Sequence, residues 1–237
     1  AKMKSVPNEE KKEFAENLHD YIGNDLKKIN IVIGGPPCQG FSMAGARIRN
    51  GFLEDERNYL FKHYFKIIQQ IEPDYFLMEN VEGLLSMNDG EIINEIENLF
   101  EDEKNFSNGR YFLTKRVFSM EEYGVPQRRR RLVIIGRKKH SLDLDSAISI
   151  LKKQDNSFFS RVSIRDAISD LNFLESSEGN QRQNYILPSC SEYQKLRRKE
   201  NVDLYNHIAT KHSEIALERI KKIKVGENWQ TLDENIK

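Results

Sequence analysis

The pattern of apolar and polar positions predicts strands and helices in alternation from residue 31 to residue 136. Short apolar runs of the strand type occupy 31–33, 75–78, 110–119 and 132–136, whereas 58–71 and 91–100 place apolar residues at helical spacing. A strand, a crossover helix and a second strand in sequence favour parallel pairing with right-handed connections. The pattern therefore predicts an α/β fold with a mostly parallel sheet and flanking helices.

The pattern changes near residue 160. Residues 163–171 predict one more helix, for which Ser163 is a suitable N-cap, and 212–224 return to helical spacing. Between them, residues 172–203 are rich in Ser, Asn, Gln and Arg and show little apolar periodicity. We interpret them as a linker or surface region.

Composition narrows the class of protein. Lys plus Arg equals Asp plus Glu at 37 each, so any basic patch must be local. No apolar run approaches the roughly 20 residues of a membrane span, and the first residues lack the apolar core of a signal peptide. Cys38 and Cys190 are the only cysteines and neither belongs to a C-x-x-C pair, which predicts no zinc site, no disulfide framework and a reducing cytoplasm.

Candidate chemistry gathers where the predicted strands end. Cys38 follows the first strand in the segment GGPPCQGFS, Glu79 ends the strand after it, and four arginines at 128–131 directly precede a third strand. Ligands bind at the carboxyl edge of parallel sheets, so these groups are expected to converge. A lone cysteine is more often a small core residue and an arginine run a solvated surface, but together they indicate a covalent catalyst.

The motifs resemble those of the DNA (cytosine-5) methyltransferases of bacterial restriction-modification systems. Pro36-Pro37-Cys38-Gln39 is similar to their catalytic motif, Glu79-Asn80-Val81 to their ENV motif, and 127–131 to their Q-x-R-x-R motif. The resemblance is close over 22–172 and looser over 207–232. It implies a Rossmann-like fold dependent on S-adenosylmethionine, without a metal, that acts on double-stranded DNA beside a cognate restriction endonuclease.

The resemblance also implies roles for individual residues. Cys38 would attack C6 of a cytosine flipped out of the duplex, which makes C5 nucleophilic enough to accept a methyl group. Glu79 would act as an acid at N3, which requires a carboxyl pKa raised by burial. Arg129 would hold O2, and strand alternation would place Arg131 on the same face, leaving Arg128 and Arg130 free for phosphate or solvent.

Two further groups of residues follow from the same resemblance. The residues expected to bind the cofactor are Asp25, Pro37 and Leu60. The residues expected to contact DNA are Gln39, Ser42, Arg47, Asn80, Gln127 and Arg128.

The sequence also departs from this family. It contains no F-x-G-x-G segment for the methionine part of the cofactor, nor a match to the family's C-terminal motifs. We therefore expect an internal part of a longer methyltransferase: a partial catalytic domain at 1–172, then a linker and the beginning of a target-recognition region at 173–237. Such a chain would be inactive alone and would self-associate through an uncovered sheet edge. Two alternatives are a tRNA cytosine-5 methyltransferase and a non-catalytic nucleic-acid-binding fragment.

Overall fold

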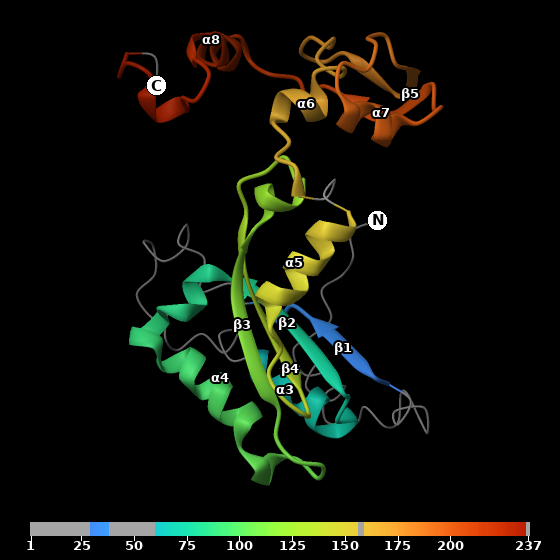
Figure 1. The fold of residues 1–237 in the computed structure, drawn as a ribbon. Helices are drawn as coiled ribbons and strands as arrows, with labels where there is room; N and C mark the ends of the chain where they lie inside the picture. Colours follow the sequence, from blue (N-terminus) through green and yellow to red (C-terminus); the bar gives the residue numbers. More distant parts are fainter. Residues whose placement is uncertain (1–28, 38–59, 156–158, 236–237) are drawn as a thin grey trace. The chain divides into compact units, whose positions relative to one another are not determined.

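The computed structural model describes residues 29–37, 60–155 and 159–235 (Figure 1). Contacts within the chain divide it into unit 1, Ala1–Arg161, and unit 2, Val162–Lys237. In the described ranges, no helix combines the length and the apolar character needed to cross a membrane.

The centre of unit 1 is a four-stranded sheet in the order β1-β2-β4-β3. Its strands are β1 (Ile31–Gly34), β2 (Tyr75–Val81), β3 (Phe112–Ser119) and β4 (Arg130–Arg137). The predicted α/β class is confirmed. Within the described residues, however, β1 and β2 pair in parallel while β4 is antiparallel to both of its neighbours, so the sheet is mixed rather than mostly parallel. The short connection 120–129 between β3 and β4 leaves no room for a crossover, which imposes the antiparallel pairing.

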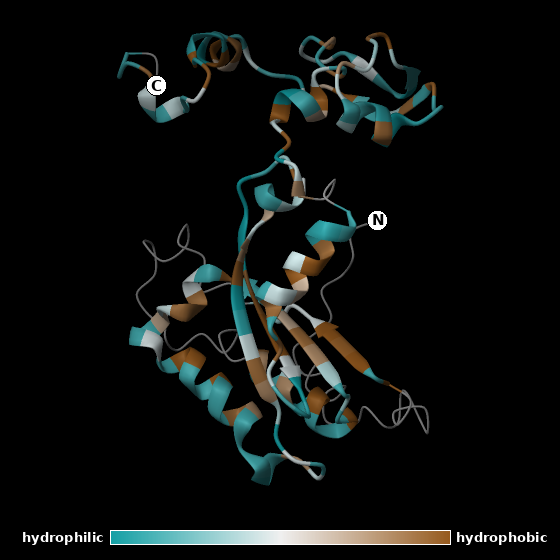
Figure 2. Cartoon of the chain, in the orientation of Figure 1, coloured by the Kyte–Doolittle hydropathy of each residue, from teal (hydrophilic) through white to brown (hydrophobic). Residues whose placement is uncertain are grey.

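Two helices cover one face of this sheet, α3 (Leu60–Ile71) and α4 (Glu91–Glu101). Their apolar sides meet the alternate buried residues of β2 and β4, and Figure 2 shows the apolar colouring of these elements. Ring-to-ring contacts dominate the core, which includes Phe61, Phe65, Phe76, Phe100, Phe106 and Tyr111. Both helices were predicted from the helical spacing of their apolar residues. This spacing arises because one side of each helix is buried against the sheet.

Tyr64 fixes α3 against the two parallel strands. Its hydroxyl donates hydrogen bonds to the carbonyls of Leu77 at 3.0 Å and Val32 at 3.3 Å. Its ring crosses Gly34 so closely that a Cβ on that residue would lie 2.5 Å from a ring carbon. Packing against Tyr64 therefore requires glycine at the end of β1. The same contact fixes the position from which the segment after β1 begins.

Helix α5 (Leu144–Gln154) has no counterpart among the predicted elements. It begins at an N-cap, Asp143, whose side chain accepts a hydrogen bond from the backbone of Ser146, and it contains no buried residue. Arg116 of β3 forms an ion pair with Asp145 at the start of the helix. A helix held by its cap and by surface charges leaves a weak apolar signal, which explains the omission.

A partly buried ion pair closes the end of unit 1 opposite the predicted site. Glu72 directly follows α3 and has a left-handed φ of 47°. Its carboxylate accepts hydrogen bonds from the backbone of Ser107 at 2.6 Å and Asn108 at 3.1 Å and from the Lys138 ammonium at 3.0 Å. Lys138 also lies over the rings of Phe106 and Tyr111. Partial burial raises the pKa of Glu72, but the hydrogen bonds from Ser107 and Lys138 and the charge of Lys138 outweigh it, so the net pKa is lowered.

Glu72→Gln is expected to reduce the free energy of unfolding of unit 1 by about 2–3 kcal/mol, because both partners are only 12 % exposed and the Lys138 charge would lose its counterion. The control is Glu95→Gln, which breaks the exposed pair with Lys62 and is expected to change less than about 0.5 kcal/mol. A lowered pKa means that the contribution of Glu72 is present above the ordinary glutamate range and is lost as pH falls through the lowered value.

Urea titrations followed by far-ultraviolet circular dichroism at pH 7 and below pH 4 measure both effects, since the only tryptophan, Trp229, belongs to unit 2. A difference between the wild type and Glu72→Gln that does not shrink at the lower pH would contradict this account.

Unit 2 contains more regular structure than its sequence indicates. Its elements are α6 (Ile164–Ile168), β5 (Gly179–Asn184), α7 (Glu192–Arg198), β6 (Asp203–Ile208) and α8 (Glu214–Lys222). Ser163 caps α6, as predicted, in a capping box with Asp166. The linker alternative for 172–203 is wrong, because β5 pairs with β6 and α7 lies between them in the sequence, whereas the surface alternative agrees with the mostly exposed residues of this range. β5 has the polar sequence GNQRQN, so no apolar alternation marks it as a strand.

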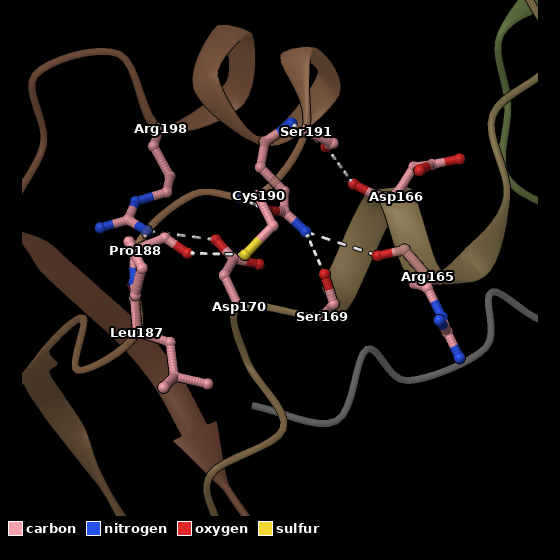
Figure 3. Close-up of polar contacts among 10 residues, drawn as sticks. Arg165, Asp166, Ser169, Asp170, Leu187, Pro188, Cys190, Ser191 and Arg198 are labelled. Atoms are coloured by element: carbon pink, nitrogen blue, oxygen red, sulfur yellow. Dashed lines mark hydrogen bonds and ion pairs between the residues drawn. The ribbon is translucent and has the colours of Figure 1, made fainter.

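Polar contacts hold the centre of unit 2 (Figure 3). The side chain of Gln194, 2 % exposed, accepts a hydrogen bond from the backbone of Cys190 and donates to Ser169 Oγ at 2.8 Å. Arg198 contacts the buried carboxylate of Asp170 at 3.4 Å and donates to the carbonyl of Leu187 at 2.9 Å. A core stabilised by hydrogen bonds rather than by apolar periodicity is not visible in a hydropathy pattern.

Candidate active site

The parallel pairing of β1 and β2 brings the segment after β1 beside the end of β2. Gly34 lies opposite Met78, so the following residues continue along Glu79 and Asn80. Asn80 is 5 % exposed; its amide donates to the carbonyl of Pro36 at 3.3 Å, and its oxygen accepts from the backbone of Val81 at 2.9 Å. Asn80 was predicted to contact DNA. In the structure its amide is used inside the protein, and it ties the proline segment to β2.

The carboxylate of Glu79 lies over the same segment. A Cβ added to Gly35 would stand 3.1 Å from Glu79 Oε2, which is closer than side chains normally approach. Glycine at 35 therefore lets the carboxylate approach the backbone that leads through Pro36 and Pro37 to Cys38. Gly35 was not among the predicted site residues, although a second glycine before two prolines was a visible signal.

Glu79 forms an ion pair with Arg131, which lies in β4 on the same face of the sheet. Arg131 Nε lies 2.7 Å from Glu79 Oε1, and the two strands are in a register that pairs Val81 with Arg131. The Arg131 side chain is 21 % exposed and that of Glu79 is 41 % exposed. The described residues thus bring the predicted acid and one predicted arginine together, but they do not provide the burial of Glu79 that was expected.

The next arginine makes a second ion pair on the opposite face. Arg130 donates from Nε and Nη2 to the two carboxylate oxygens of Glu82, at 2.6 and 2.7 Å. Arg130, which was expected to be left for phosphate or solvent, is 58 % exposed, and Glu82 is its partner in this structure. The hydrogen bond from Arg130 lowers the pKa of Glu82, so the pair is intact at neutral pH and is lost only as Glu82 protonates in acid.

The remaining residues of the arginine run precede the strand. Arg128 and Arg129 are exposed and have no ion-pair partner among the described residues, and Gln127 is exposed as well. The backbone of Arg129 accepts a hydrogen bond from Met120 at 2.9 Å. β4 begins only at Arg130, so strand alternation does not by itself assign the face of Arg129.

Part of the predicted site lies outside the described residues, namely Asp25, Cys38, Gln39, Ser42 and Arg47. Of the residues expected to bind the cofactor, Pro37 is exposed at the end of the segment after β1, and Leu60 is the partly buried first residue of α3. In the part of the chain that is described, no three His, Cys, Asp or Glu side chains are placed to hold a metal ion.

Comparisons with known proteins match the chain to a family of DNA methylases. Residues 1–236 match the family described as C-5 cytosine-specific DNA methylase. The chain is 34 % identical over 225 residues to the Type II methyltransferase M.DdeI of Desulfomicrobium norvegicum, covering 93 % of this chain and 52 % of the relative. It is 32 % identical over 222 residues to the Type II methyltransferase M1.HphI of Haemophilus parahaemolyticus, covering 94 % and 49 %.

A solved structure shares the fold. The crystal structure of a prophage-encoded protein from E. coli, described as a DNA modification methyltransferase, superposes with a TM-score of 0.59 at 24 % identity. The match covers 92 % of this chain and 62 % of that one. The chain spans about half the length of the curated relatives it matches.

Proposed function

The chain belongs to the C-5 cytosine-specific DNA methylase family, and on that premise we propose that it activates a flipped cytosine of double-stranded DNA for methylation at C5. The observation that supports this most is the position of the Glu79 carboxylate. It lies between Arg131, which holds it at 2.7 Å, and Gly35, on the segment that leads to Cys38. An acid, a cation and a thiol-bearing segment at one sheet edge suit covalent chemistry on a base.

In the proposed reaction the Cys38 thiolate forms a bond to C6 of the cytosine. The electron pair moves toward N3, where Glu79 donates a proton that it has taken up from solvent as the base enters, and C5 becomes an enamine carbon. Arg129 and Arg131 stabilise the charge that develops on the ring and its O2. After C5 has been methylated, its proton passes to water, the bond between C6 and sulfur breaks, N3 returns its proton to Glu79, and the Cys38 thiolate is regenerated.

S-adenosylmethionine would supply the methyl group. Pro37 and Leu60 are the two proposed contacts that the structure describes, and both offer apolar surface suited to the adenine. The 237 residues contain no F-x-G-x-G turn for the methionine part. The described residues therefore fit only part of the cofactor.

We propose different functions for two parts of the chain. Residues 1–172 would carry the catalytic part, and 173–237 would begin the target-recognition region. Further partners would be a cognate restriction endonuclease and a second copy of the chain at β1, which is an edge strand among the described residues. Ile31 and Ile33 of β1 are 54 % and 69 % exposed, which suits pairing along that edge.

The choice of nucleic acid is tested by transfer of tritium from labelled S-adenosylmethionine in a protein that contains this chain and supplies the full cofactor site. We expect incorporation into mixed-sequence duplex DNA that far exceeds incorporation into tRNA. The reverse preference would establish the tRNA alternative. The third reading, a non-catalytic nucleic-acid-binding fragment, predicts incorporation into neither substrate.

Residues 1–237 alone are expected to give no multiple turnover in the same assay. Positioning of two reactants can account for roughly 7–11 kcal/mol of a barrier, and a cofactor held only by apolar contacts loses most of it. Calorimetric titration of the chain with S-adenosylmethionine measures the binding directly. Tight binding together with many turnovers would show that these residues already contain a complete cofactor site.

A further inference from the structure

The Glu82–Arg130 pair is more specific than a chance contact between surface charges. Both carboxylate oxygens accept from one guanidinium edge, at 2.6 and 2.7 Å, which is the two-pronged geometry that arginine forms with carboxylates and phosphates alike. Nη1 of Arg130 has no hydrogen-bond partner among the described residues. One planar acceptor group thus occupies the edge of Arg130 best suited to a phosphate.

The place of this pair in the fold connects it with the candidate active site. Glu82 follows the ENV segment directly, and Arg130 stands between Arg129 and Arg131. The neighbouring pair, Glu79 with Arg131, lies on the other face of the same two strands. Arg130 therefore adjoins in the sequence the two arginines proposed to meet the flipped base, and its side chain leaves β4 on the face opposite to Arg131.

Solvent reaches both partners. The side chain of Arg130 is 58 % exposed and that of Glu82 is 43 % exposed, so another anion can approach without unfolding any element. An exposed ion pair contributes little to stability, and a phosphate of DNA offers the same two-oxygen acceptor with a full negative charge. Exchange of one acceptor for the other is therefore feasible while the fold stays intact.

We propose that the Arg130 guanidinium is a binding site for a DNA backbone phosphate and that Glu82 occupies this site in the free protein. On this account, which rests on the proposed function, Glu82 is displaced when DNA binds. The occupied site weakens attachment to arbitrary duplexes and makes it more dependent on the fit of the whole complex. The role of Glu82 is thus to mask a phosphate site, and it takes no part in the reaction.

The test uses residues 1–237, a labelled mixed-sequence duplex of about 20 base pairs and fluorescence anisotropy over a series of NaCl concentrations. Glu82→Gln is expected to tighten binding several-fold at low salt, because Arg130 no longer has to give up an anionic partner. Arg130→Met is expected to weaken binding and to lower the slope of log Kd against log salt by about 1, the value for one phosphate contact.

Glu122→Gln is the matched control. Glu122 is exposed and close enough for its charge to act on Arg130, without forming an ion pair with it. This variant removes the same charge, and less than a twofold effect is expected. The decisive variant is Glu82→Gln combined with Arg130→Met, in which the gain from Glu82→Gln should disappear.

Equal gains from Glu82→Gln and Glu122→Gln, or a gain that persists with Arg130→Met, would reduce the effect to general surface charge and overturn the proposal. Failure of Glu82→Gln to bind the duplex at low salt would overturn it as well. Trapping of a covalent adduct through Cys38, described below, tests the proposed function separately, so the two ideas fail on different measurements.

Discussion

Replacing Cys38 with serine is expected to abolish methyl transfer and to prevent the denaturation-resistant adduct that forms with duplex DNA containing 5-fluorocytosine. Fluorine at C5 cannot leave as a proton, so the bond between sulfur and C6 persists in the wild type. A hydroxyl is a far weaker nucleophile than a thiolate at neutral pH, and loss of a covalent nucleophile can lower turnover on the order of a millionfold. Denaturing gel electrophoresis of a protein that contains this chain and a complete cofactor site measures the adduct.

The chain provides its own control in Cys190. This second cysteine is exposed in unit 2, and its Sγ lies 3.4 Å from the carbonyl of Pro188. Cys190→Ser makes the same atomic change away from the proposed chemistry and should leave the adduct intact. Cys38→Ser should still bind DNA in an anisotropy assay. An adduct that survives Cys38→Ser would remove this residue from the mechanism and favour the non-catalytic alternative.

Replacing Arg129 with alanine is expected to lower methyl transfer roughly a hundredfold more than replacing Arg128. We propose that Arg129 meets O2 of the base, and loss of one charged hydrogen bond in a preorganised site corresponds to about 3 kcal/mol. Arg128→Ala should instead weaken DNA binding and its salt dependence, as loss of a phosphate contact does. Single-turnover rates and binding titrations on both variants separate the two effects.

This comparison is well matched, because Arg128 and Arg129 are adjacent, exposed and without an ion-pair partner among the described residues. The expectation assumes that the alternation of β4 extends back beyond Arg130, where the strand begins. Equal losses of rate at the two positions would mean that the alternation stops at Arg130, and Arg131 would then be the arginine nearest the base.

Where burial and periodicity coincide, the sequence alone was sufficient to predict the helices. Helices α3 and α4 bury apolar residues at every helical turn, and both were predicted close to their observed ends. Helix α5 buries nothing, and unit 2 places Gln194 and Asp170 among its buried residues. Such elements are fixed by caps, ion pairs and hydrogen bonds, which depend on partners far apart in the sequence and leave no periodic record.

The candidate site, like the fold, could be predicted from the sequence only in part. Motif order indicated that Glu79 and the arginine run belong together, and the structure places Glu79 beside Arg131. The order of motifs carried no information about Glu82, Gly35 or the inward-facing role of Asn80. These contacts depend on the register of neighbouring strands and on the distance between backbones, which a single sequence does not state.

The register of the antiparallel strands β2 and β4 determines whether the motif residues come together in one site. It pairs Val81 with Arg131 and Glu79 with Val133, and side chains on each strand point alternately to opposite faces. A slip of one residue would keep every motif in the sequence and yet send Glu79 and Arg131 to opposite sides of the sheet. Grafting this chemistry onto another scaffold therefore requires β2 and β4 in their observed register, together with the two residues that follow β1. Transfer of the motifs alone would not be enough.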